Sequence, residues 1–212
     1  WREARLVAGK DLRVEWRSRV AVGQVAPFAV LVLVLFGFAL DADTQALRNF
    51  TGGLYWATVL FSSVLAIQRS FGLESADGNR DALRLSGLDP VAIFLGKTAA
   101  LALQLLVLEV ILGAGVAILY DPRLEDAPLL FATAGVATIG IAAAGTLYGV
   151  LSAGLRVRET ILPILLLPVL APVLIGATRA FDDALGTVAV DGWNWLALLG
   201  LTAVVYLAFG AL

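Results

Sequence analysis

The chain alternates between long apolar runs and shorter polar segments that carry most of its charges. A helix needs about 20 apolar residues to cross the hydrocarbon core of a bilayer. Because the backbone in lipid must satisfy its own hydrogen bonds, such runs are expected to be α-helical. A β-barrel would instead show alternating segments of about ten residues. The pattern therefore predicts six transmembrane helices, at residues 20–40, 50–68, 93–119, 128–153, 161–180 and 194–212.

The ends of these runs carry local signals. Asp89 followed by Pro90 predicts an N-cap and a proline in the first turn of the third helix. Pro128 is expected to open the fourth helix in the same way. Trp193 and Trp195 stand where the sixth helix enters the membrane, as interfacial aromatic residues do.

Composition agrees with a membrane protein. Apolar residues make up 60% of the 212 residues, and the mean hydropathy is +0.90. Soluble domains carry about 45–50% apolar residues, so lipid must cover part of this surface. No second domain stands out. We therefore expect one all-α, polytopic membrane domain over residues 1–212.

The distribution of Lys and Arg predicts the orientation. Most of these residues lie in the N-terminal segment or around the loops that follow the second and fourth runs: Arg2, Arg5, Lys10, Arg13, Arg17, Arg19, Arg69, Arg80, Arg84, Lys97, Arg156 and Arg158. The opposite side carries Arg48, Arg123 and Arg179 among many acidic residues. Since basic loops stay in the cytoplasm, both termini are expected there.

Residues 1–19 form an amphipathic pattern at helical spacing. One side is basic, with Arg2, Lys10, Arg13 and Arg17, and the other carries Trp1, Val7, Ala8, Leu12 and Trp16. Such a helix is expected to lie in the membrane interface. It serves either as an anchor that sets the topology or as a site for a partner.

The cytoplasmic loop between the second and third runs is too long for a minimal helix hairpin. Residues 79–86 are expected to form a short helix that is capped by Asp77 or Asn79 and ends at Gly87. Its leucines lie in an otherwise polar stretch. Either they dock into a groove of another protein, or they pack against the membrane domain.

The third run contains two ionisable residues, Lys97 and Glu109, and the amide residue Gln104. An ionisable residue within a membrane helix is costly and is a functional candidate. Lys97 and Gln104 share one face, but Glu109 is turned away from Gln104, so no proton relay is evident. A structural role and a transport role of Glu109 both remain open, as do a watery environment and a partner for its carboxyl.

Two further patterns concern helix geometry. Gly145 and Gly149 form a GxxxG pattern, which suits close packing within the chain or between two copies. Pro163, Pro168 and Pro172 fall within ten residues of the fifth run and predict a broken or bent helix. Such a bend is either a hinge or a static feature.

Several chemistries are excluded by residues that the chain lacks. Without Cys, His or Met, it offers no zinc site of the usual kind, and the rarer Tyr is the one haem ligand left. It also lacks the phosphate-binding loop G-x-x-x-x-G-K-[ST]. We therefore expect a non-catalytic chain with no metal site, whose energy for any active transport comes from another subunit.

Four stretches of the chain together match a known family: Trp56 with 62–66, Arg69 and Phe71; Asp77-Gly78 with Leu83, Leu85, Pro90 and Gly96-Lys97; Leu155-Arg156; and the run 167–175. In order and spacing, over nearly the whole chain, they resemble the cytochrome c maturation protein B family. That family is the permease subunit of the haem-exporter ABC complex.

The resemblance implies a permease dimer in the bacterial inner membrane that binds two copies of an ATPase subunit. The ATPase would grip a coupling loop that contains Glu74, Asp77, Gly78, Arg80, Leu83, Arg84 and Leu85. The other implied partners are a haem-handling membrane subunit, a small single-span subunit and a periplasmic haem chaperone, whose haem-loaded form ATP hydrolysis would release. Because this chain lacks the common iron ligands, we expect the partners to ligate haem and the partner ATPase to bind ATP, so that this chain binds no cofactor itself.

Three other functions remain as alternatives. The chain suits an ABC-2-type exporter of a lipid, drug or polysaccharide. It also suits a proton-coupled secondary transporter that uses Glu109. Finally, it suits a scaffold that assembles haem-ligating proteins without transporting anything.

Overall fold

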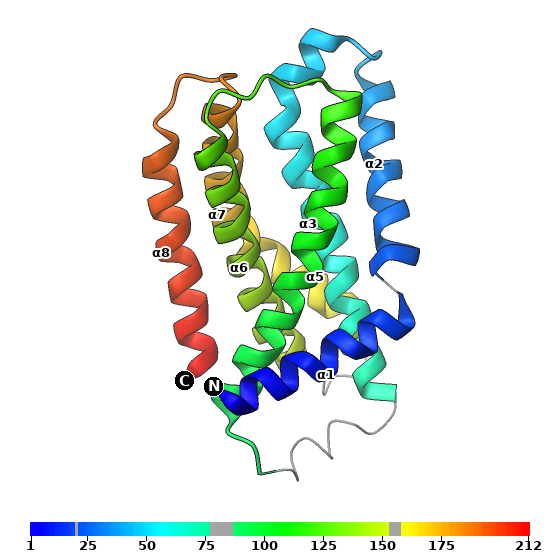
Figure 1. The fold of residues 1–212 in the computed structure, drawn as a ribbon, viewed down its shortest axis with the longest axis vertical. Coiled ribbons are helices and arrows are strands. Elements are labelled where there is room, and N and C mark those ends of the chain that lie inside the picture. Colours follow the sequence, from blue (N-terminus) through cyan, green and yellow to red (C-terminus); the bar gives the residue numbers. More distant parts are fainter. Residues whose placement is uncertain (20, 77–86, 153–157) are drawn as a thin grey trace.

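The computed structural model describes residues 1–19, 21–76, 87–152 and 158–212, and the regular structure in these ranges is helical (Figure 1). The elements in chain order are α1 (Arg2–Ser18), η1 (Ala21–Val25), α2 (Ala26–Ala39), α3 (Thr44–Ala76), α5 (Pro90–Leu119), α6 (Ala127–Ser152), α7 (Arg158–Ala184) and α8 (Gly192–Ala211). The prediction of an all-α fold is confirmed.

Five helices of the described chain are long and apolar enough to cross a membrane. They are Thr44–Gly72, Pro90–Leu119, Ala127–Ser152, Ile161–Ala184 and Gly192–Ala211. A sixth span is reached when α1 and α2, which meet at a bend, are counted together. The protein is thus a multi-pass membrane protein, and several helices run past the apolar limits that we predicted from the sequence.

The first predicted span differs most from its expectation. A short π-helix, η1, precedes α2, and Pro27 lies in the first turn of α2. Proline has no N–H, and its ring clashes with the carbonyl four residues earlier. The backbone before Pro27 therefore cannot keep regular α-helical bonding, and a wider π-turn takes its place.

α6 lies at the centre of the bundle and contacts α3, α5, α7 and α8. Four of its alanines, Ala137 and 142–144, are fully buried. Without a hydrophobic driving force between helices in lipid, close approach of small residues is what lets membrane helices pack. The alanine-rich composition of this helix thus accounts for its central place.

The two ends of the bundle differ. Both termini and α1 lie at one end, and the turns after α2, α5 and α7 lie at the other (Figure 1). At the latter end, Arg48 of α3 forms an ion pair with Asp121. Burial there raises the pKa of Tyr120 to about 12, so its hydroxyl stays protonated and donates to the carbonyl of Leu33 at 2.7 Å.

The predicted start of the third helix is confirmed. The Asp89 carboxylate accepts a hydrogen bond from the backbone N–H of Val91 at 3.1 Å, with Pro90 as the first helical residue. Pro128 lies in the first turn of α6, where Asp126 accepts from the N–H of Leu129 at 3.0 Å. Both helices therefore begin where the sequence indicated.

Candidate functional site

Glu109 lies in the second half of α5 and faces the interior of the bundle. Its side chain is 4% exposed, whereas the next residue, Val110, is 72% exposed. The Oγ1 of Thr138, on α6, lies 2.6 Å from the Oε1 of Glu109, which is hydrogen-bond distance. The carboxyl is therefore enclosed by protein and paired with a hydroxyl of a neighbouring helix.

Three aromatic residues of α3 and α7 form a group that meets Glu109 through Tyr55. The hydroxyl of Tyr55, on α3, donates to the backbone carbonyl of Glu109 at 3.3 Å. The ring of Tyr55 stacks on Phe181 of α7 with centroids 5.1 Å apart, and Trp56 meets both rings edge to face. We call Glu109, Thr138, Tyr55, Trp56 and Phe181 the Glu109 cluster.

Sequence reasoning missed every member of this cluster except Glu109, because the others come from separate helices. One signal was present. Hydroxyl residues of the membrane helices are mostly buried, among them Thr51, Thr58, Thr133, Thr138 and Thr146. A threonine within an apolar run therefore indicates the inward face of a membrane helix.

Several buried polar atoms have no hydrogen-bond partner in the described part of the chain. They are Trp56 Nε1, Ser62 Oγ, Thr98 Oγ1, Glu109 Oε2, Thr133 Oγ1 and Thr146 Oγ1. Burying a polar group without a partner costs about 1–3 kcal/mol by mutational measurements. Two of the six atoms, Trp56 Nε1 and Glu109 Oε2, belong to the Glu109 cluster.

Lys97 and Gln104 do not join the Glu109 cluster. The Nζ of Lys97 lies 3.4 Å from a carboxylate oxygen of Asp11 on α1, and 5.5 Å from the centroid of the Phe71 ring. Gln104 is half-buried. Lys97, Gln104 and Glu109 therefore occupy separate environments.

Helix α1 is docked across the end of α5. A side chain at Gly96 would place its Cβ 2.6 Å from the carbonyl oxygen of Ala4 and 2.8 Å from the Cβ of Val7. The carboxylate of Glu3 accepts from the N–H of Asp89 at 3.2 Å. Because Gly96 has no side chain, α1 can lie close to α5. The Lys97–Asp11 ion pair stabilises this contact.

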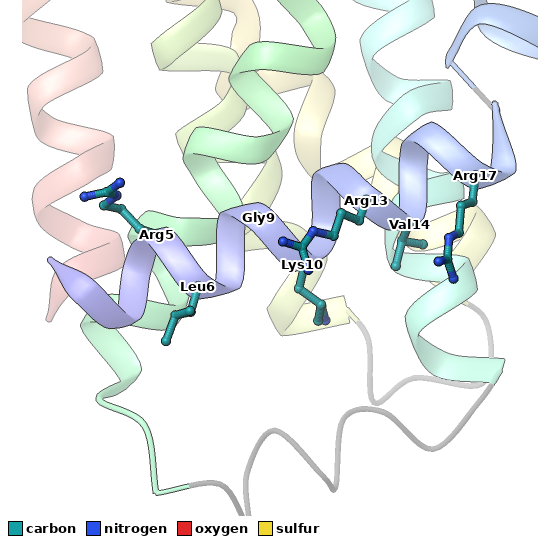
Figure 2. A pocket seen from close by; sticks show the side chains of 7 residues that line it. All are labelled: Arg5, Leu6, Gly9, Lys10, Arg13, Val14 and Arg17. Atoms are coloured by element: carbon teal, nitrogen blue, oxygen red, sulfur yellow. The ribbon is translucent and has the colours of Figure 1, made fainter.

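The outer side of α1 is basic and lines a shallow groove (Figure 2). Leu6 and Lys10 point away from the bundle, while Trp1 and Trp16 are 94% and 84% exposed. The apolar side predicted from the sequence is thus only partly covered, by the contacts of Val7 and the half-buried Ala8 and Leu12. The groove residues are Arg5, Leu6, Gly9, Lys10, Arg13, Val14 and Arg17.

The expected coupling loop falls mostly outside the described residues. Asp77, Gly78, Arg80, Leu83, Arg84, Leu85 and the predicted helix 79–86 all lie there, as do Leu155 and Arg156. Glu74 belongs to α3, but its side chain is also outside the description. The described ends of this segment, on α3 and α5, lie at the same end of the bundle as α1 (Figure 1).

The GxxxG residues of α6 face another helix of the same chain. A Cβ at Gly145 would lie 2.5 Å from the Cδ1 of Ile67, and a Cβ at Gly149 would clash with the ring of Phe71. Both neighbours belong to α3. The sequence left open whether the GxxxG pattern packs within the chain or between two copies. The contacts with Ile67 and Phe71 are contacts within the chain.

The three prolines of α7 lie inside one continuous helix from Arg158 to Ala184. The sequence predicted a broken or bent helix, and of these two outcomes the break does not occur. The hydroxyl of Tyr206 on α8 donates to the carbonyl of Val169, between Pro168 and Pro172, and so joins this part of α7 to α8.

These features define a multi-pass α-helical membrane protein with an enclosed polar cluster. Within the described ranges, no group of three His, Cys, Asp or Glu side chains is placed to hold a metal ion. The profile of the CcmB protein family matches residues 3–212. The chain belongs to this family.

Curated relatives share sequence over most of their length. Heme exporter protein B of Escherichia coli strain K12 is 31% identical over 204 residues, which cover 94% of this chain and 88% of the relative. The protein of the same name from Haemophilus influenzae is 26% identical and covers 90% and 86% of the two chains. The one from Pseudomonas aeruginosa is 24% identical and covers 96% and 92%.

Proposed function

We propose that this chain is the membrane permease subunit of an ABC-type complex for cytochrome c biogenesis. The observation that carries the proposal is the match to proteins named heme exporter protein B along nearly the whole chain. In the complex, a partner ATPase hydrolyses ATP, and this chain couples hydrolysis to haem delivery and to release of a haem-loaded periplasmic chaperone.

The chain itself acts mechanically in this proposal. It has no His, Cys or Met to ligate haem iron and no phosphate-binding loop for ATP. Haem is therefore the cargo of partner subunits, and ATP is bound by the ATPase. A spectrum of the purified chain alone that showed stoichiometric, axially ligated haem would contradict this division of labour.

In this proposal, the partner ATPase moves the permease through the coupling loop. Its residues Glu74, Asp77, Gly78, Arg80, Leu83, Arg84 and Leu85 lie between α3 and α5 in the sequence. Movement of the loop would pull on both helices. Because α1 is fixed to α5 near Gly96 and by the Lys97–Asp11 ion pair, it would move with them.

The assembly that we propose contains two copies of this chain and an ATP-binding subunit, together with the haem-handling membrane subunit and the small single-span subunit. The chain contributes a single permease domain over residues 1–212. It lies in the bacterial inner membrane with both termini in the cytoplasm, as the basic N-terminal segment favours.

A pull-down of the intact complex with a Leu83→Asp variant tests the proposal. We expect Leu83→Asp to abolish co-purification of the ATPase while membrane insertion stays intact, because a buried carboxylate disfavours an apolar docking contact. The matched control is Leu124→Asp, at a 54% exposed leucine in the loop after α5. Unchanged co-purification with Leu83→Asp, or a complex without an ATPase, would reject the proposal.

A proton-coupled secondary transporter is the second candidate, because the enclosed carboxyl of Glu109 suits an intramembrane carrier residue. Glu109→Gln would then abolish proton-coupled uptake. ATP-dependent function that survives this substitution would exclude this candidate.

A further inference from the structure

The hydroxyl of Thr138 has two close oxygen neighbours but only one hydrogen. Its Oγ1 lies 2.6 Å from Glu109 Oε1 and 2.7 Å from the backbone carbonyl oxygen of Ala134. Both distances fall in the range of about 2.5–3.0 Å in which O–H···O hydrogen bonds occur. Since a threonine hydroxyl donates once, one of the two contacts needs a hydrogen from elsewhere.

Other threonines of the chain show which neighbour normally takes the hydroxyl hydrogen. Thr51, Thr58 and Thr202 each donate to the carbonyl four residues earlier, at 2.8, 2.8 and 2.9 Å. None of these three bonds involves a carboxyl. Donation from Thr138 to Ala134 is therefore the ordinary arrangement, and it leaves the contact with Glu109 without a hydrogen from the threonine.

We propose that Glu109 binds a proton and donates it to Thr138, so that α5 and α6 are joined by a proton held inside the membrane. The neutral carboxylic acid donates through Oε1 to Thr138, and Thr138 donates to Ala134. Each short oxygen–oxygen contact then contains one hydrogen. The ligand of this site is the proton itself.

An ionised Glu109 fits the same geometry less well. Thr138 would have to donate to the carboxylate, and two acceptor oxygens would then face each other across the 2.7 Å contact with Ala134. The second carboxyl oxygen, Oε2, is buried and has no hydrogen-bond partner among the described residues. A partial charge on that oxygen would be desolvated and unpaired, whereas the carbonyl oxygen of a neutral acid carries less charge.

No cationic side chain in the part of the chain that the structure describes forms an ion pair with Glu109, and Lys97 is paired with Asp11. The Tyr55 hydroxyl donates to the backbone carbonyl of Glu109 and not to its carboxyl. The burial of Glu109, the missing partner of its Oε2 and the single hydrogen of Thr138 therefore all favour a protonated, neutral Glu109.

The proton bound by Glu109 requires neither the cargo nor the ATPase, and it joins α5 to the central helix α6. Infrared spectroscopy of the full chain in lipid nanodiscs at neutral pH tests it directly. We expect the wild-type minus Glu109→Gln difference spectrum to contain the carbonyl stretch of a protonated carboxylic acid, shifted in D2O. Carboxylate stretches in its place would overturn the proposal.

A second variant keeps the test valid if Glu109→Gln fails to fold. Thr138→Val removes the acceptor, so the acid carbonyl band is expected to persist at a shifted frequency. Thr58→Val is the matched control, since it removes the same kind of backbone hydrogen bond at another buried site and is expected to leave the band unchanged. An unshifted band in Thr138→Val would contradict donation to Thr138.

Discussion

At the scale of single residues, two positions of α5 determine how α1 and α6 pack against this helix. Gly96 leaves room for the backbone of α1, and Glu109 places a polar group against α6. Residue type alone does not reveal the role of Gly96, because the same helix also contains a glycine that no other element approaches closely. Gly113, on the same helix, has no atom within 4 Å of the position that a Cβ would take.

The substitution Gly96→Ala is expected to displace α1. The new Cβ would lie 2.6 Å from the carbonyl oxygen of Ala4, a backbone atom that cannot rotate away. We expect a loss of about 1–3 kcal/mol of stability, typical of overpacking. Faster tryptic cleavage within α1, after Arg5 and Lys10, measures the loss of docking.

Gly113→Ala is the control for that prediction. Since alanine stabilises a helix by about 0.5–1 kcal/mol relative to glycine, this change is expected to leave the cleavage rate of α1 as it is. Equal cleavage of the two variants would show that Gly96 is not the docking point.

At the scale of elements, α6 organises the bundle through its small residues. Its glycine face lies against α3, where Gly145 meets Ile67 and Gly149 meets Phe71. The Phe71 ring in turn lies under the ammonium group of Lys97. Packing between α6 and α3 is thus linked to the position of Lys97, which holds α1.

We expect Gly149→Ala to destabilise the α3–α6 contact by about 1–3 kcal/mol, because the added methyl group overlaps the Phe71 ring. Phe71→Leu in the same chain is expected to recover part of the loss. Thermal unfolding of the two single variants and the double variant gives the coupling energy of the pair.

Gly135→Ala, on the same helix, is the matched control, since nothing lies within 4 Å of its Cβ position. Additive effects of Gly149→Ala and Phe71→Leu would mean that the two residues do not meet. The GxxxG pattern would then be free to act between two copies of the chain.

At the scale of the whole molecule, the chain has two chemically different ends. The basic helix α1 and both termini lie at one end, and the turns after α2, α5 and α7 lie at the other (Figure 1). This arrangement requires an even number of crossings. The orientation in the membrane follows from the positive-inside rule and remains a prediction.

Because the chain contains no Cys, single introduced cysteines report the orientation without background. In intact cells with a permeable outer membrane, we expect Leu124→Cys and Val188→Cys to react with a membrane-impermeant maleimide. Leu6→Cys, on α1, is expected to react only after the inner membrane is opened. These three side chains are at least partly exposed, at 54%, 39% and 63%. The reverse labelling pattern would invert the proposed topology.

Much of the fold followed from apolar runs. Run length and hydropathy predict five of the helices by themselves, and Asp89-Pro90 predicts where α5 begins. The first span, predicted over residues 20–40, has a shorter regular α-helix in the structure, Ala26–Ala39, because of Pro27. The sequence also did not predict that α7 continues through its three prolines from Arg158 to Ala184.

The sequence by itself determined that this protein is helical, spans the membrane several times and carries no common haem ligand or ATP loop. Only the tertiary structure decided which face of each helix points inward. In a soluble protein, alternation of polar and apolar residues marks the inward face. In lipid, both faces of a helix are apolar, so that signal disappears. The partners of Glu109, Gly96 and Gly149 therefore emerge only when the helices are packed.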